Sequence, residues 1–381
     1  MSNNKKIVFI TRHDPSGVGG GAYATKAYLN ALIHLYGCRI VLFVSDNFDS
    51  VNFKIVESQV IRVKSRNRLS AFFGLFFGKL TRFNSIFDSW IRKNSNNIEK
   101  VIFDGGIIGG TFVKAVNSVK GIETLIIHHN EEIEYHLDNK SIESFRGKFL
   151  FWINRLQRTG YKNSDKNLFI TQSDLQKFEY LYGKYKNYFI GCFESLDNSF
   201  TYPICEPDYN GKIVISGALN AKETVDGIYR FNNNIFKLLK INYPNISLTI
   251  VGKNPSTNLA KYCKLNGFVL IDSPADIKLV IQKCDLYVCP TYSGGGMKIR
   301  LMDPFSLGIP SLVHENSIRG YEVMLKSGFV NIYNDANDFF IKYEQIINSN
   351  FDRKNSSIFF YENFSFEVGV LRLGNILNIE K

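Results

Sequence analysis

The sequence lacks the features that mark secreted or membrane-spanning proteins. Its six cysteines show no Cys-x-x-Cys spacing, and most lie in apolar runs, which favours reduced and buried thiols over a disulfide framework. No run of about eighteen apolar residues is present. The first residues, Met-Ser-Asn-Asn-Lys-Lys, lead into a strand-like run and not into a signal-peptide core. We therefore expect a cytoplasmic protein.

Proline is also scarce, with nine in 381 residues, which argues against long disordered linkers. Hydrophobic residues make up 45% and charged residues 21%, as in globular proteins. A chain of this length exceeds one ordinary core, so two domains are expected. The net charge of +11 suggests an anionic partner: a nucleotide, a nucleic acid or lipid headgroups. Composition does not choose among them.

Apolar strand-like runs alternate with helical patterns along both halves of the chain. This alternation predicts an α/β protein made of two doubly wound, Rossmann-like domains that face each other across a ligand-binding cleft. We place the first domain at 1–200 and the second at 201–365. Residues 366–381 are expected to form a helix that packs back on the first domain.

A glycine loop follows the first expected strand, 5–11, and precedes an amphipathic helix. Its Gly17-x-Gly19-x-x-Ala22 pattern, with Asp46 after the second strand, is a loose match to a dinucleotide-binding fingerprint. In that fingerprint the glycines follow the strand almost at once, whereas five residues intervene here. An NAD-dependent oxidoreductase is therefore the weaker interpretation of this loop.

Two stretches, 65–93 and 145–166, interleave basic and aromatic residues and each contain one acid. Helices of this kind can lie on an anionic membrane surface, where each basic residue contributes about 1 kcal/mol. The aromatic residues of 65–93 can equally form the core face of an ordinary helix, and 145–166 can equally present an ordinary solvated face. The sequence leaves both interpretations open.

Residues 124–128 form another expected strand, which delivers His129, Asn130 and Glu131 at its carboxyl end. Ligands of open α/β sheets bind at that end of the strands. His129 is therefore a candidate site residue, although adjacent histidines and acids also occur in ordinary solvated loops. A metal site is disfavoured, because no second His/Cys pair lies at ligand spacing.

The strongest signal is the segment 285–310, where an apolar strand is followed by Gly294-Gly295-Gly296 and a helical pattern that stops at Gly308-Ile309-Pro310. Free N–H groups at such a turn suit an anion. We expect Lys298 on the first turn of the helix, and Asp303 one to two turns further in. A carboxylate placed there can accept hydrogen bonds from two sugar hydroxyls.

This segment resembles the donor-binding part of glycosyltransferase family 4, which are retaining enzymes of the GT-B fold. The resemblance extends over nearly the whole chain, through weaker matches at the early glycine loop, His129-Asn130, Thr171, Gly217, 220–227, 250–252 and 363–366. It implies a transferase that moves a hexosyl or deoxyhexosyl unit from a UDP, GDP or dTDP sugar to a saccharide or lipid-linked acceptor. Surface polysaccharide or capsule assembly, at the inner face of the cell membrane, is the expected setting.

The resemblance also implies roles for individual residues. Asp303 would hold the ribose hydroxyls, His129 would bind the transferred sugar or polarise the attacking hydroxyl, and Lys298 would assist at the diphosphate. Asn130 and Glu131 would lie on the acceptor side. The remaining residues expected to bind the nucleotide sugar are Gly19, Gly20, Gly21, Gly217, Lys222, Ser273, Gly294, Gly295, Gly296 and Met297.

Two features depart from the family pattern: the acid pair and the basic residue after Gly217. Asp303 replaces the second glutamate of the family's acid pair, and Gly295 stands where the first acid normally grips the sugar. The Lys or Arg expected after Gly217 is represented only by Lys222. These departures leave the sugar unnamed and make a non-catalytic nucleotide-sugar-binding subunit the main alternative.

A metal-independent mechanism is expected, without a cofactor, because the chain contains no Asp-x-Asp pair to bridge a diphosphate through a divalent ion. Helix N-termini, glycine N–H groups and Lys298 would stabilise the leaving group instead. We expect no nucleic-acid partner, because the net charge is the sole feature of the sequence that favours one.

Overall fold

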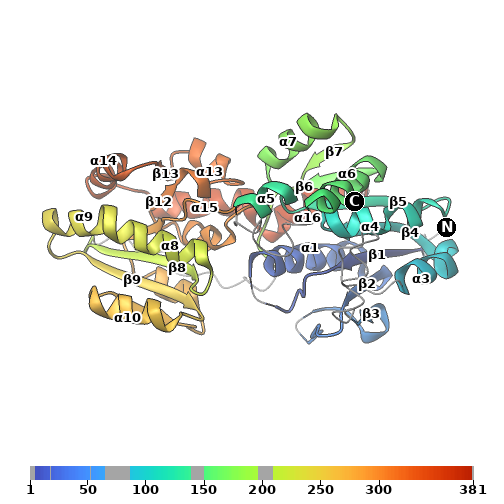
Figure 1. Ribbon diagram of the computed structural model, residues 1–381, viewed down its shortest axis with the longest axis horizontal. Helices are drawn as coiled ribbons and strands as arrows, with labels where there is room; N and C mark the ends of the chain where they lie inside the picture. The colour runs from blue at the N-terminus through green and yellow to red at the C-terminus, as the bar shows by residue number, and fades with distance from the viewer. Residues whose placement is uncertain are drawn as a thin grey trace. The chain divides into compact units, whose positions relative to one another are not determined.

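The computed structural model describes residues 5–17, 19–51, 53–64, 86–138, 150–195 and 209–379. Contacts divide the chain into two compact units, each built around one parallel sheet (Figure 1). The first unit comprises Met1–Asn198, Gly295–Met297 and Phe366–Lys381, and the second comprises Ser199–Gly294 and Lys298–Ser365. Within the described ranges, no helix is long and apolar enough to cross a membrane.

The sheet of the first unit has the strand order β3-β2-β1-β4-β5-β6-β7, and every neighbouring pair is parallel. Its central strands are rich in Ile, Val, Leu and Phe and are almost wholly buried, as expected for a sheet covered on both faces. The strands are β1 (Lys6–Thr11), β2 (Ile40–Ser45), β3 (Val60–Val63), β4 (Ile98–Asp104), β5 (Glu123–His128), β6 (Lys166–Phe169) and β7 (Asn187–Phe189).

The helices of the first unit occupy the connections between these strands and the end of the chain. They are α1 (Gly20–Tyr36), α3 (Ile86–Asn94), α4 (Gly106–Asn117), α5 (Glu132–Asp138), α6 (Leu150–Asn163), α7 (Gln172–Tyr182) and α16 (Phe366–Ile376). The last of them, α16, packs against α1, where the rings of Phe366 and His34 meet edge to face. The Lys166 ammonium of β6 also donates to the Ile376 carbonyl, 2.8 Å away, which ties the end of α16 to the sheet.

The second unit has the strand order β10-β9-β8-β11-β12-β13, again wholly parallel. The strands are β8 (Lys212–Ala218), β9 (Ser247–Lys253), β10 (Val269–Asp272), β11 (Leu286–Cys289), β12 (Ser311–His314) and β13 (Val330–Tyr333). The helices are α8 (Lys222–Phe231), α9 (Lys237–Asn242), α10 (Thr257–Leu265), α11 (Ile277–Ile281), α12 (Met302–Ser306), α13 (Glu322–Lys326), α14 (Ala336–Ile347) and α15 (Arg353–Phe364).

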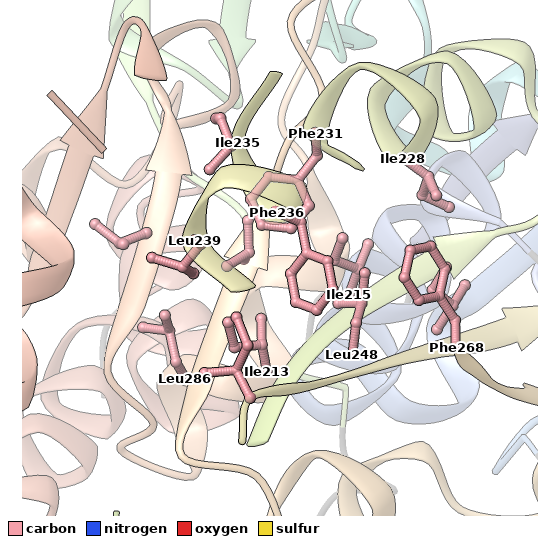
Figure 2. Packing of buried hydrophobic residues seen from close by; sticks show 14 of the residues in the cluster. Ile213, Ile215, Ile228, Phe231, Ile235, Phe236, Leu239, Leu248, Phe268 and Leu286 are labelled. Atoms are coloured by element: carbon pink, nitrogen blue, oxygen red, sulfur yellow. The ribbon is translucent and has the colours of Figure 1, made fainter. Parts of the chain in front are cut away.

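The core of the second unit lies between its sheet and the long helical segment that follows β8. Figure 2 shows Phe231, Phe236 and Leu239 of this segment over strand residues such as Ile215 and Leu248. A π-helical turn at Asn232–Phe236 joins α8 to α9, so this helical segment has an irregular middle.

The two predicted basic aromatic stretches are described only in part. In α3, Phe87 is buried and Trp90 packs on Phe43 of β2, so these aromatic residues belong to the core. In α6, by contrast, Phe151 is 70% exposed. Residues 65–85 and 145–149 of the predicted stretches lie outside the described residues.

The described cysteines are all free, as expected from their spacing. Cys192, Cys263, Cys284 and Cys289 are buried, whereas Cys38 is exposed. The expectation of buried thiols is therefore wrong for Cys38, which follows α1 at an exposed helix end. Cys205 lies outside the described residues.

Glycines allow an unusually close crossing of α4 and α6 in the first unit. A Cβ added to Gly110 would lie 1.9 Å from the Leu156 carbonyl oxygen, and one added to Gly160 would lie 2.9 Å from the Gly110 nitrogen. Backbone atoms at that distance cannot be accommodated by turning a side chain. The pairing of α4 with α6, and hence the placement of β4 and β5 beneath them, depends on these glycines.

We predict that Gly110→Ala lowers the free energy of unfolding by about 1–3 kcal/mol or more, because the helices must separate to accept the methyl group. Lys114→Ala, at an exposed position of the same helix, is the control and should change stability by less than about 0.5 kcal/mol. Denaturant unfolding measures both. Equal stabilities for the two variants would contradict the close crossing.

Candidate functional site

Each sheet has one point where the strand order reverses. In the first unit this point lies between β1 and β4, and in the second it lies between β8 and β11. The connections that leave two such strands pass to opposite faces of the sheet, which opens a crevice at their carboxyl ends where ligands bind in open α/β folds. Asp104 lies at the first of these two points and Arg300 at the second.

In the first unit, a buried carboxylate spans the reversal point. Thr11, the last residue of β1, and Thr25 of α1 each donate a hydroxyl hydrogen bond of 2.6 Å to Oδ2 of Asp104, the last residue of β4. Oδ1 of Asp104 lies 2.6 Å from Nε2 of His129, which follows β5. Burial raises the pKa of Asp104, but the histidines and hydroxyl donors outweigh it and hold that pKa well below its usual value.

The structure thus confirms that His129 lies at a strand end and adds Asp104 as its partner, a residue that no sequence argument singled out. With Nε2 directed at the carboxylate, the ring is fixed in orientation and Nδ1 is left for other contacts. A Ser, Thr or Asn in place of Asp104 would not supply the same charge. The pairing joins positions 25 residues apart, so no local motif reveals it.

A second histidine lies beside this pair. The His13 ring is 5.5 Å from the His129 ring between centroids, and burial lowers the pKa of His13 to about 4, so it is neutral at pH 7. A Cβ on Gly21 would lie 3.0 Å from Cε1 of His13, so the glycine loop allows α1 to approach this ring. Gly19, with φ of 123°, precedes the first helical residue, Gly20. These glycines are near the histidine cluster, and their predicted phosphate contacts stay predictions.

Asn130 and Glu131 were predicted to lie on the acceptor side. Asn130 is partly exposed. Glu131 is 3% exposed, and its carboxylate accepts from the Glu134 backbone N–H at 2.7 Å and from Gln157 Nε2 at 2.6 Å. Glu131 therefore caps the N-terminus of α5, and its acceptor role stays a prediction.

In the second unit, the glycine-rich segment differs from its predicted form. The glycines do not open a helix: residues 290–298 form a loop, Ile299–Leu301 form one 3₁₀ turn, and α12 begins only at Met302. Lys298 therefore precedes the helical region, and its Nζ donates to the Gly294 carbonyl at 2.7 Å. Positive φ angles at Gly294 and Gly296, of 90° and 75°, shape the loop that this bond closes.

Burial, followed by repulsion from Arg300, lowers the pKa of Lys298 to about 8. The ammonium is thus charged at neutral pH in a place where its charge is costly, a condition that a bound anion would relieve. Asp303, partly exposed in the first turn of α12, follows Lys298 in the same segment. Gly295, Gly296 and Met297 are likewise partly exposed.

At the reversal point of the second unit, the side chain of Arg300 connects the ends of two strands. Nη1 donates to Thr224 Oγ1 at 2.8 Å, in α8 beyond β8, and Nη2 donates to Thr291 Oγ1 at 2.6 Å, just after β11. Gly217, at the carboxyl end of β8, makes room for it, since a Cβ there would lie 2.3 Å from Nη1. Lys222, the residue predicted to serve this place, is exposed at the start of α8.

Ser273, predicted to lie near a nucleotide base, follows β10 in a left-handed conformation with φ of 48°. Its backbone N–H donates to the Gly252 carbonyl at 2.8 Å, and its hydroxyl donates to Asp272 at 2.6 Å. Non-glycine residues with positive φ often mark functional loops. The side chain is exposed, and its role stays a prediction.

Among the side chains that the structure describes, no group of three or more His, Cys, Asp or Glu residues could hold a metal ion. Metal independence nevertheless stays a prediction.

Comparison with known structures identifies the fold. HepE of Anabaena, solved in complex with UDP, has a TM-score of 0.69 and 12% identity, with 98% of this chain and 99% of that chain covered. The lipopolysaccharide outer core galactosyltransferase WaaB has a TM-score of 0.67 and 16% identity over the same shares. TarM has a TM-score of 0.65 and 12% identity, again over 98% and 99%. The protein has the GT-B fold.

Sequence comparison identifies the second unit. Residues 210–349 match the family described as glycosyl transferases group 1. The matched range runs from β8 through α14 and includes Lys298, Arg300 and Asp303. A search of curated proteins found no match. By this domain the protein is a glycosyltransferase, and the interpretation of the early glycine loop as an oxidoreductase site is set aside.

We predict that Asp104→Asn lowers the free energy of unfolding at pH 7 by about 3 kcal/mol, because it removes a buried charge from its hydrogen-bond partners. A carboxyl whose folded pKa is depressed stabilises the fold above its unfolded pKa, near 3.8, and this contribution is lost as the pH falls. The difference between variant and wild type should therefore stay constant from pH 7 to about pH 5 and shrink as the pH falls further, in denaturant titrations. The exposed Asp46→Asn is the control, and a pH-independent difference for Asp104→Asn would contradict the assignment.

Proposed function

We propose that this protein is a retaining, metal-independent glycosyltransferase that moves a sugar from a nucleotide sugar to a saccharide or lipid-linked acceptor. The match of residues 210–349 to glycosyl transferases group 1 is the observation that carries the proposal. The solved structures of HepE contain UDP, UDP with glucose, and UDP-glucose, so UDP sugars are the first donors to test. Polysaccharide or capsule assembly is the setting we propose.

Each polar group at the two reversal points has a task in this scheme. Asp303 accepts hydrogen bonds from the ribose hydroxyls. The loop at Gly294–Gly296 and Lys298 meet the diphosphate, where N–H groups and positive charge stabilise the leaving group. His129, held by Asp104, binds the transferred sugar or polarises the acceptor hydroxyl. Gly295 leaves the sugar without the acid that family 4 commonly places there, and this fits a donor recognised by other groups.

We expect a thermal-shift screen over UDP, GDP and dTDP sugars to show stabilisation by one class of nucleotide, by roughly 2.7 kcal/mol at a hundred times the dissociation constant. Asp303→Asn should weaken that binding about tenfold or more, since a ribose contact is lost. Glu362→Gln, an exposed position on α15, is the matched control. In the transfer assay, the product should keep the anomeric configuration of the donor and form at an undiminished rate in EDTA.

The components of this proposal fail separately. If wild-type protein binds none of the nucleotide sugars, the transferase proposal is wrong. Binding without transfer, restored only by a partner enzyme, would establish the non-catalytic alternative. Loss of transfer in EDTA overturns metal independence, and an inverted product overturns retention.

A peripheral position on an anionic membrane is part of the proposal, since lipid-linked acceptors lie there. Support comes from α6, where the exposed Phe151 is followed by the exposed Arg155 and Arg158. An aromatic residue with basic neighbours on one helix suits the interface of an anionic bilayer. The net charge of +11 acts in the same direction.

We predict that the protein sediments with vesicles that contain phosphatidylglycerol and that Phe151→Ser reduces the bound fraction several-fold. Tyr180→Ser on α7, a residue that is 89% exposed, is the control for losing an exposed aromatic. Vesicles of phosphatidylcholine alone should bind little, because the basic residues find no counter-charge. Equal binding by the Phe151 and Tyr180 variants would show that α6 is not the contact.

A further inference from the structure

Arg300 is held by neutral groups, and Glu223 attracts its charge only from a distance, without an ion pair. Its hydrogen-bond partners are the Thr224 and Thr291 hydroxyls and, at 3.5 Å, the Ser216 carbonyl oxygen. Across the described residues, no carboxylate forms an ion pair with Arg300. Its Nε is buried without a hydrogen-bond partner. The fold therefore keeps a guanidinium in a largely enclosed place where, among the described residues, no carboxylate is in direct contact with it.

Such an arrangement costs stability. A buried polar group without a partner costs about 1–3 kcal/mol, and an unpaired charge costs more. Hydroxyls orient a guanidinium but do not neutralise it. If Arg300 only connected α8 with the loop after β11, hydrogen bonds would be enough, and a neutral side chain could provide them. The charge of Arg300 is thus more than its hydrogen bonds require, and Glu223 attracts it only without an ion pair.

The position of this charge indicates what it serves. The guanidinium lies between the groups that follow β8 and β11, the two strands at which the sheet order reverses. Gly217 lets the backbone of β8 lie against Nη1, since a Cβ there would be 2.3 Å from that atom. An anion over this strand end would meet a fixed positive charge and the N–H groups that follow β8. Lys298, two residues earlier in the chain, adds a second cation whose pKa is already lowered beside Arg300.

We propose that Arg300, and not Lys222, supplies the positive charge that binds the diphosphate of the nucleotide sugar. This inference rests on the proposed function. Lys222 is exposed at the start of α8, where its charge is solvated. Arg300 is held by two hydroxyls from separate segments, so its charge is fixed before the ligand binds and needs no reorganisation during transfer.

The same charge acts on the leaving group. In the transfer, the bond between the sugar carbon and the diphosphate oxygen breaks, and its electron pair stays on that oxygen. The acceptor oxygen forms the new bond to the carbon, and its proton leaves with the diphosphate. Negative charge thus grows on the diphosphate, and a fixed guanidinium stabilises it most at that stage.

The test compares the binding of UDP, which carries the diphosphate, with that of uridine, which does not, by calorimetry on the full-length protein. If the protein prefers another base, the matching nucleoside pair is used. Arg300→Gln should lower the affinity for UDP at least tenfold and change the affinity for uridine by no more than about twofold. Arg300→Lys should recover part of the UDP affinity, because it restores charge without the two-hydroxyl grip. Arg230→Gln is the control for net charge, since Arg230 is exposed and lies over the Tyr292 ring. The Arg230→Gln variant should bind UDP and uridine with unchanged affinity.

A purely structural role would give a different pattern. Arg300→Gln would then lower the melting temperature and weaken UDP and uridine equally, and that outcome overturns the proposal. So does unchanged UDP affinity in Arg300→Gln. If Arg300→Gln does not fold, the UDP-to-uridine ratio of Arg300→Lys decides in the same way. Wild-type protein that binds neither UDP, GDP nor dTDP sugars refutes the proposed function itself, whereas wild-type binding with an unchanged Arg300→Gln refutes only this inference.

Discussion

The feature on which this site depends is the reversal of strand order in each parallel sheet. Neighbouring strands whose connections leave toward opposite faces keep a gap at their carboxyl ends, and the chain has lined both gaps with charge. At the first, two hydroxyls hold the carboxylate of Asp104 and aim it at His129. At the second, two hydroxyls hold the guanidinium of Arg300. In both cases the hydroxyls come from segments that only the sheet topology brings together.

The two charges are treated differently by their surroundings. Asp104 has an ionisable partner, so its charge is used within the first unit to orient an imidazole. Arg300 forms no ion pair among the described residues, although Glu223 attracts its charge, and its neighbour Lys298 is a like charge whose pKa falls to about 8. A site in which positive charge is in excess favours a negatively charged ligand. The diphosphate of a nucleotide sugar has that sign, in a domain that matches glycosyl transferases group 1.

The order of strands and helices could be predicted because it depends on local sequence patterns. Apolar runs such as those of β4, β8 and β11 are recognisable from composition, and the segment that contains Lys298 and Asp303 is recognisable from spacing. The helix expected directly after the glycines was wrong, because the Lys298 side chain binds back to Gly294 and the backbone stays in a loop until Ile299. Asp104 and Arg300 could not be found, since their partners lie 25 to 93 and 9 to 84 residues away.

Hydrogen–deuterium exchange in the presence of a bound nucleotide sugar tests the central claim most directly, because it reports where the ligand protects the backbone without altering any residue. Our account predicts slower exchange at the carboxyl end of β8, around Gly217, and through the loop and turn at 291–303. Slower exchange confined to the glycine loop near Gly19, with those second-unit segments unchanged, would contradict it.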